Sequence, residues 1–215
     1  MTNGAGSDRR AELLALAAHL FAERGLRATT VRDIADAAGI LSGSLYHHFD
    51  SKESMVDEIL RGFLDELFGR YRAIVAKGLG PRATLEAVVV ASFEAIDQQH
   101  AAVSIYQSEA RHLTDQPRFA YIDARWAEFR SLWLGILRDG VADGSFRADL
   151  DVELAYRFLR DTVWVGVGWY RPGGAVSVDA VAEQYLNIVL DGISARRRPA
   201  RRGANRDSQQ GAGHG

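Results

Sequence analysis

One stretch of this 215-residue sequence, Thr29 to Lys52, reads TTVRDIADAAGILSGSLYHHFDSK and constrains the fold more than any other. Its apolar residues are spaced as in two short helices joined by a tight turn, whereas the polar side chains of the second helix fall on its outer face. The positions expected inside the pair are Ile34, Ala35, Ala38, Leu45 and Phe49. This pattern is a helix-turn-helix, so double-stranded DNA is the first partner to consider.

Local signals agree with this interpretation. Thr30, with Asp33 three residues later, approximates a capping box, and the acid is favourably placed in the helix dipole. Gly39 stands where the first helix must stop and the chain must reverse, a position that often needs a positive φ. The sequence therefore predicts a helix that starts after Thr30 and ends at Gly39.

The following caps are predicted in the same way. Ser42 can cap the second helix, and Asp50 and Ser51 can open a third, longer one. A helical hairpin with no role in DNA binding fits the periodicity equally well, and what argues against it is the string SxSLYHHFxSKE.

Charge and composition limit the possible functions. The formal net charge is −2, so the chain as a whole does not attract phosphate. A positively charged surface for DNA must therefore come from how the basic side chains are arranged in space. The chain has no Cys, which excludes disulfides and a Cys-based zinc site and leaves a cytoplasmic location as the expectation. His100 and His112 have no acids at ligand spacing, so we expect no metal.

Helical periodicity continues along the chain and no strand alternation appears, which predicts an all-α fold. The helix that begins at Lys52 would join the helix-turn-helix to the rest of the chain, so its angle is the natural mechanical link between the two parts. The predicted helices are Leu13 to Ala22, Lys52 to about Ala76, Arg82 to about Gln98, Val103 to Arg111, Arg118 to about Val141, Val152 to Trp169 and about Asp179 to Ser194.

Two arginines of the helix from Val152 to Trp169 are expected to differ. Arg157 has Asp161 four residues on, the usual arrangement of a local ion pair. Arg160 has aromatic neighbours one turn away on each side, including Trp164, so it needs a partner from outside the helix. An acid such as Glu109 or Glu128 is one possibility, and an anionic ligand bound by Arg160 with Trp164 beside it is the other.

Further aromatic and basic residues lie on helices that could face the same cavity, although an aromatic stripe is often simple core. These weaker ligand candidates are Tyr106, Trp126, Arg130 and Trp133.

The last two helices, with glycines that allow close backbone approach, form either an intrachain core or a dimer interface. The interface candidates are Gly166, Gly168, Tyr185, Ile188 and Val189.

The motif T-x-x-x-I-A-x-x-A-G-[VI], followed by L-Y-x-H-F-x-x-K-E, resembles the DNA-binding domain of the TetR family of bacterial transcriptional regulators. The resemblance implies an all-helical homodimer in which the last two helices form a four-helix bundle with their symmetry mates. It implies that a small molecule in the C-terminal domain relieves repression. The domains are then residues 1–51 for DNA, residues 52–195 for ligand and dimer, and a basic, disordered tail over 196–215.

Longer strings, LRATTVRDIADAAGILSGSLYHHF and YRFLRDTVWVGVGWYRPGG, resemble the actinobacterial cholesterol-catabolism repressors of that family, the group governing the last two steroid rings. This resemblance implies an acyl-CoA thioester of a ring-degradation intermediate as effector. A different lipid or fatty acyl-CoA pathway, or drug efflux, is the alternative. No nucleophile with a base, paired carboxylates or phosphate loop is evident, so we expect neither an enzyme nor a cofactor.

The recognition helix supplies the expected DNA contacts. Ser44, Tyr46 and His47 should face the major groove, because they lie along that helix. Residues at helix ends should contact mainly phosphates. The phosphate candidates are Thr30, His48 and Lys52, and the DNA-binding set is completed by Arg32, Leu41, Ser42 and Gly43.

Overall fold

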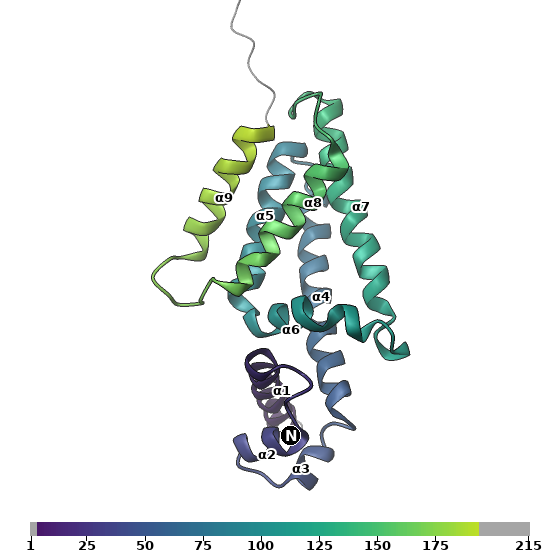
Figure 1. Ribbon diagram of the computed structural model, residues 1–215, viewed down its shortest axis with the longest axis vertical. Coiled ribbons are helices and arrows are strands. Elements are labelled where there is room, and N and C mark those ends of the chain that lie inside the picture. The colour runs from purple at the N-terminus through teal and green to yellow at the C-terminus, as the bar shows by residue number, and fades with distance from the viewer. Residues whose placement is uncertain (1–3, 194–215) are drawn as a thin grey trace, which may run out of the picture.

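The computed structural model describes residues 4–193, and within that range every regular element is a helix (Figure 1). The elements are α1 (Gly4–Arg24), α2 (Val31–Ala37), α3 (Ser42–Tyr46), α4 (Lys52–Ala76), α5 (Pro81–Gln98), α6 (His100–Leu113), the 3-10 turn η1 (Pro117–Phe119), α7 (Tyr121–Ala142), α8 (Val152–Trp164), the 3-10 turn η2 (Val165–Gly168) and α9 (Val178–Ile193). The all-α prediction is confirmed. The predicted tail, 196–215, lies outside the described range.

The first two predicted boundaries of the helix-turn-helix are confirmed. Thr30 caps α2 in a reciprocal box, because its hydroxyl accepts from the Asp33 amide at 3.1 Å and its own amide donates to the Asp33 carboxylate at 2.7 Å. Gly39 takes φ 67°, in the left-handed region that glycine occupies without a steric penalty. Gly25, with φ 83°, ends α1 in the same way.

The start of α3 differs from the prediction. Ser42 is the first residue of the helix and not its cap, since Leu41 takes the N-cap position without a side-chain hydrogen bond. α4 is opened by Ser51, whose hydroxyl accepts from the Ser54 amide at 3.1 Å. A helix of five residues therefore stands between two well-defined boundaries, Gly39 and Ser51.

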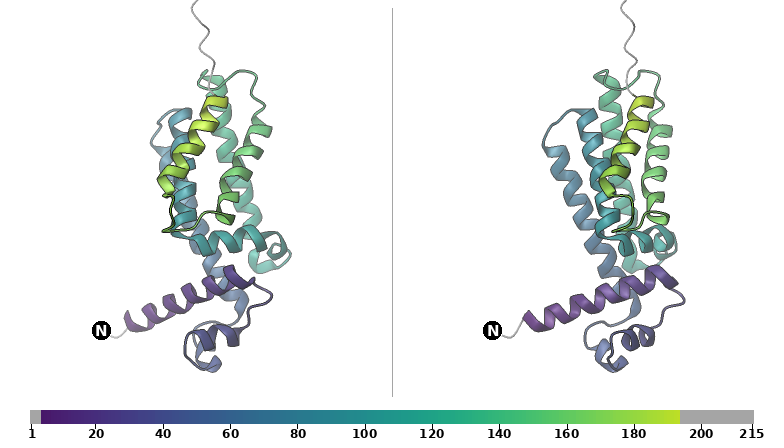
Figure 2. Two further views of the ribbon diagram at one scale, coloured as in Figure 1. Left: turned by 60° about the vertical axis from the view of Figure 1, so that its left-hand side comes forward. Right: turned by 90° about the vertical axis from the view of Figure 1, so that its left-hand side faces the viewer.

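α4 carries the helix-turn-helix into the body of the molecule. It runs upward from the α1–α3 end in Figure 1, and its side with Met55, Ile59, Phe63 and Leu67 is buried. α1 crosses beneath the body and packs against α6 as well as against α2 and α4 (Figure 2). Movement of α4 or α6 can therefore be transmitted to the helix-turn-helix.

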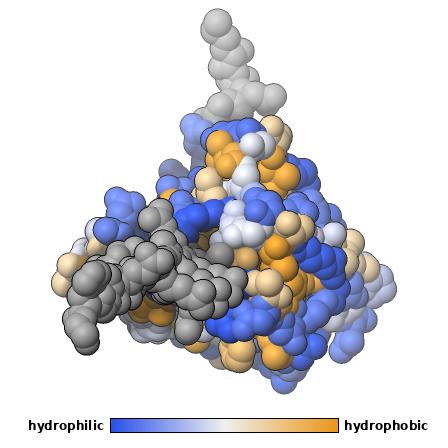
Figure 3. Space-filling view, turned by 90° about the horizontal axis from the view of Figure 1, so that it is seen from above, coloured by the Kyte–Doolittle hydropathy of each residue, from blue (hydrophilic) through white to orange (hydrophobic). Residues whose placement is uncertain are grey.

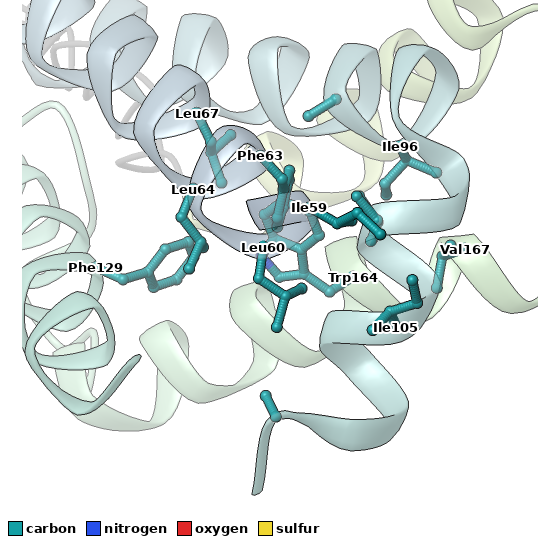
Figure 4. Close-up of a cluster of buried hydrophobic side chains, with 14 of the residues drawn as sticks. Ile59, Leu60, Phe63, Leu64, Leu67, Ile96, Ile105, Phe129, Trp164 and Val167 are labelled. Carbon is teal, nitrogen blue, oxygen red and sulfur yellow. The ribbon is translucent and has the colours of Figure 1, made fainter. Parts of the chain in front are cut away.

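The core of the body surrounds the middle of α4. Figure 4 shows Phe63 and Leu64 of α4 among Phe129 of α7 and Trp164 of α8, with α5 and α6 supplying aliphatic side chains. The Phe63 and Trp164 rings meet edge to face, with centroids 6.2 Å apart. Viewed along the long axis onto the end where α9 finishes, apolar residues form patches among polar ones (Figure 3). None of the described helices is long and apolar enough to cross a membrane.

Four helix predictions need correction. α1 begins at Gly4, nine residues before the predicted start at Leu13. α6 begins at His100, three residues before the predicted start. The long helix predicted from Arg118 is divided into η1 and α7. α8 ends at Trp164 and not at Trp169, because the chain tightens into the 3-10 turn η2 around Gly166. Asp151 caps α8, because its carboxylate accepts from the Leu154 amide at 3.0 Å.

Gly140 is a packing requirement of α7. A Cβ atom added there would lie 2.1 Å from Cδ2 of Phe146, a ring that is 1% exposed. We expect Gly140→Ala to lower the free energy of unfolding by about 1–3 kcal/mol, measured by denaturant titration. Gly135→Ala is the matched control, since no atom lies within 4 Å of its added Cβ and alanine favours a helix. Equal stability of the two variants would contradict this packing.

Candidate functional site

The outer surface of the helix-turn-helix presents short polar side chains and two large exposed ones. Leu41 is 80% exposed and Tyr46 is 55% exposed. Gly43, Ser44 and His47 are also exposed, whereas Leu45 is buried against the other helices. Thr30 and Arg32 are exposed and Ser42 and His48 are half-buried. The predicted DNA-binding residues thus share one region, with Leu45 anchoring the helix that carries them.

Lys52 has an additional role that the sequence did not indicate. Its ammonium group donates to the carbonyl oxygens of Leu26 at 2.7 Å and Thr29 at 3.1 Å, and its side chain is half-buried. These bonds tie the first residue of α4 to the loop between α1 and α2. Lys52 is therefore a positioning residue within the helix-turn-helix, and a purely phosphate-directed role does not fit its geometry.

We expect Lys52→Met to lower the free energy of unfolding by about 1–2 kcal/mol, because two carbonyl groups lose a charge-assisted donor. Denaturant titration gives this value, and the salt dependence of DNA binding gives the second readout. Arg32→Met is the control for stability only, since Arg32 is exposed and its paired acid, Asp36, is 3.7 Å away. Unchanged stability, together with a salt slope lower by about one, would indicate that Lys52 contacts a DNA phosphate and does not position the helices.

A cavity of about 590 Å³ lies within the body. Its apolar walls come from the core side of α4 and from α7 and α8, and its polar groups come from α6, α7 and α8. Its charged and large aromatic lining residues include Tyr106, Arg111, Trp126, Arg130, Arg160, Asp161 and Trp164. Five of the six predicted ligand candidates therefore line one cavity, and its α4 wall (Leu64, Leu67, Phe68) places it against the connecting helix.

The exception is Trp133, which is fully buried and does not line the cavity. Its ring stacks on Phe129, with centroids 5.3 Å apart, and meets Tyr71 edge to face. Trp133 is a core residue, so its assignment to ligand binding was wrong. Trp164 belongs to the core and also lines the cavity, although it is only 5% exposed.

Arg160 has a partner that helical spacing did not reveal. Its Nε donates to Oδ1 of Asp161 at 2.6 Å, and its guanidinium lies 5.5 Å from the centre of the Tyr156 ring. The hydrogen bond from Arg160 lowers the pKa of Asp161. Neither Glu109 nor Glu128 pairs with Arg160, and the predicted pair between Arg157 and Asp161 is not formed. The Arg160 side chain is 41% exposed at the cavity and is not sealed in an aromatic interior.

Burial and ion pairing determine the charge that the other polar groups bring to the cavity. Arg130 donates to both carboxylate oxygens of Glu153, at 2.7 and 2.8 Å, so its charge is already balanced. Burial raises the pKa of Tyr106, so its hydroxyl, already neutral at physiological pH, stays neutral in more basic solution as well. The cavity can therefore take an apolar group against Trp126 and Trp164 and an anion at Arg160.

Comparison with known proteins decides the family. The family model described as bacterial regulatory proteins, tetR family, matches residues 13–59, and that described as tetracyclin repressor-like, C-terminal domain, matches residues 78–193. The chain belongs to the TetR family.

The relatives of this TetR-family chain include two proteins named HTH-type transcriptional repressor KstR2. The one from Rhodococcus jostii strain RHA1 is 72% identical, covering 88% of this chain and 93% of the relative. The one from Mycobacterium tuberculosis is 61% identical, covering 89% and 96%. The solved structure of the ketosteroid transcriptional regulator KstR2 of M. tuberculosis superposes with a TM-score of 0.86 at 60% identity, covering 91% and 98%. These relatives are named as transcriptional repressors and not as enzymes.

One face of the TetR-family body leaves large apolar side chains in solvent. Leu154, Phe158 and Val165 share a side of α8 and η2, and Phe158 is 67% exposed. Trp169 continues the row at 58%, and Ile188 of α9 is 67% exposed. We call these five residues the α8–α9 face. Sequence reasoning found only Ile188 among them, although Leu154, Phe158 and Val165 stand at helical spacing.

The other interface candidates lie differently. Gly166 is buried, and a Cβ added to it would touch Phe93 at 3.5 Å, so it packs inside the chain and its assignment to an interface was wrong. Gly168 is exposed with open space around it. Tyr185 is half-buried and its hydroxyl lies 2.9 Å from that of Thr162, which makes it chiefly an intrachain contact. Val189 is half-buried.

Proposed function

We propose that the chain is an effector-responsive transcriptional repressor that binds a palindromic operator as a homodimer. Its effector is an acyl-CoA thioester of a steroid-degradation intermediate, and binding of this effector releases the DNA. The steroid assignment rests on the relatives named KstR2, one of which is described as a ketosteroid regulator. We also propose a cytoplasmic location, because the operator and the effector are both found in the cytoplasm.

The observation that carries the proposal is the composition and position of the cavity. Its apolar walls suit a ring system, and Arg160 at its edge suits an anionic group. The same cavity is walled by α4, whose first turn closes the helix-turn-helix. An effector that favours a different position of α4 over the observed one will therefore shift the spacing of the recognition helices.

The division of the chain follows from this mechanism. We assign residues 1–51 to DNA binding and residues 52–195 to effector binding and assembly, with α4 as the link. Ser44, Tyr46 and His47 would read base edges, and exposed Leu41 would contact a thymine methyl group. Thr30, Arg32, Ser42, Gly43 and His48 would lie against the sugar-phosphate backbone.

The dimer of this proposal forms through the α8–α9 face. Several large apolar side chains in one exposed row are uncommon in a monomer and typical of an interface. Pairing of two copies through this face gives a two-fold dimer with two recognition helices, which fits half-sites about 34–36 Å apart.

Selection from a random pool of duplex DNA tests the function. The protein should enrich an inverted repeat with half-sites one helical turn or a multiple apart, and the CoA thioester of a fused bicyclic acid should elute the selected duplexes. Free CoA and the free bicyclic acid are the ligand controls, and neither should elute DNA at the same concentration. Failure to enrich any inverted repeat would contradict the repressor assignment, and elution by the free acid alone would contradict the acyl-CoA assignment.

A further inference from the structure

A chain of alternating charges joins α4 to α7 beside the cavity. Arg125 of α7 donates to the carboxylate of Asp65 on α4 and, at 2.9 Å, to that of Glu128 on α7. Arg72 of α4 donates to the other oxygen of Glu128 at 2.8 Å. Asp65 and Arg72 are seven residues apart, so both lie on the same side of α4. We call these four residues the α4–α7 strap.

The strap lies next to the wall of the cavity. α4 packs closely against α5 and α6, whereas long side chains bridge its approach to α7. Phe68 of α4 and Trp126 of α7 both line the cavity, so the cavity separates the two helices at this level. The guanidinium group of Arg125 lies 5.1 Å from the centre of the Phe68 ring. Phe68 therefore contacts both the cavity and the strap.

Farther from the helix-turn-helix, α4 and α7 are joined by buried aromatic packing. Tyr71 is fully buried, and its ring lies edge to face with that of Trp133, with centroids 6.5 Å apart. The Tyr71 hydroxyl also lies 2.6 Å from that of Ser92 on α5. Such close packing is costly to disturb, so it is a natural pivot for α4. The part of α4 nearer the helix-turn-helix can swing away from α7 only if Asp65 and Arg125 separate.

We infer that the α4–α7 strap sets the effector concentration at which DNA is released, because it holds α4 in the operator-binding position. This inference rests on the proposed function and adds the element that controls its switch. An effector between α4 and α7 presses against Phe68 and must part Asp65 from Arg125. The Asp65 side chain is 65% exposed, so water can solvate its charge after separation and the strap can open at a modest cost.

The sign of the change on breaking the strap separates this role from that of an ordinary stabilising ion pair. Loss of an ordinary pair lowers stability and leaves effector binding unchanged or weaker. Loss of a contact that opposes the effector-bound conformation raises the population of that conformation, so the effector binds more tightly. Operator affinity changes little as long as the operator-binding conformation remains the predominant one in the free protein.

Arg125→Met tests the inference, because it keeps the apolar stem beside Phe68 and removes the charge. In titration calorimetry without DNA, the full-length variant should bind the CoA thioester of the fused bicyclic acid about threefold to fivefold more tightly than the wild type. Fluorescence anisotropy with the enriched inverted repeat should show release at an effector concentration lower by the same factor. Asp65→Asn should act in the same direction. Its addition to Arg125→Met should change little, because both substitutions break the same ion pair.

Arg70→Met is the matched control. Arg70 also lies on α4, but its guanidinium group pairs with Glu66 and with Glu94 of α5, and no side chain of α5 lines the cavity. This variant should bind the thioester and release DNA as the wild type does. Unchanged or weaker thioester binding by Arg125→Met, or equal tightening by Arg70→Met, would overturn the inference while the wild type still responds to the thioester. A wild type that does not bind the thioester, or keeps its DNA after binding it, would overturn the proposed function itself.

Discussion

Phe158→Glu should convert the dimer into a monomer and weaken operator binding by about 100-fold or more. Phe158 is 67% exposed in one chain, at the middle of the α8–α9 face, so pairing would bury it. A glutamate there would have to lose its hydration without a partner when two copies meet. Each monomer would retain one recognition helix, and the loss of simultaneous contact with two half-sites accounts for the size of the effect. Sedimentation and fluorescence anisotropy with a labelled operator measure the two changes.

Val75→Glu is the control for Phe158→Glu. Val75 is also an exposed apolar residue, at 45%, but it lies near the end of α4 beside α7 and away from the α8–α9 face. It should leave assembly and operator affinity unchanged. A Phe158→Glu protein that still sediments as a dimer would remove this face from the interface.

Arg160→Met should strongly weaken the response to effector without impairing DNA binding. Methionine keeps much of the apolar stem beside Tyr156 but removes the charge that binds the anion. The pair of Arg160 with Asp161 is 41% and 64% exposed, so its loss should change stability little. We expect operator affinity within about twofold of the wild type and an effector concentration for release at least about 10-fold higher.

The comparison for Arg160→Met is Arg82→Met, which removes a positive charge paired with Glu86 on α5. That variant should release DNA at the wild-type effector concentration. Trp164→Leu would not separate effector binding from stability, because Trp164 also packs against Phe63 in the core and its loss should reduce stability. Release of DNA by Arg160→Met at the wild-type effector concentration would place the anion elsewhere.

Features set by local chemistry could be predicted from the sequence. The capping box of Thr30 with Asp33, the positive φ of Gly39 and the single apolar side of α4 each depend on residues within a few positions of one another. The helix-turn-helix and the all-α class followed from such signals. The start of α3 did not, because a serine that can cap a helix is equally able to be its first residue, and Ser42 is.

Features set by packing between helices could not be predicted in the same way. α8 is apolar on two faces, and the sequence does not say which face the chain itself covers. The chain covers Tyr156, Leu159 and Val163, and it leaves Leu154 and Phe158 in solvent. For the same reason, Gly166 was wrongly predicted to lie on the exposed interface, although the chain itself covers it.

The partner of Arg160 was missed because of how helix neighbours are counted. Residues one apart point about 100° away from each other, so Asp161 was not considered. The arginine side chain is long enough to turn back along the helix, and its Nε reaches the adjacent carboxylate. Arg111 also lines the cavity, although only Tyr106 of the same helix was predicted to do so.

We expect effector and operator to favour different conformations of the same dimer. Titration of the bicyclic acyl-CoA thioester into free protein and into protein saturated with operator tests this claim. Because coupling between two binding sites is reciprocal, operator should weaken effector binding by the same factor by which effector weakens operator binding, and we expect about 10-fold or more. Equal effector affinities of the free and operator-bound protein would contradict the claim.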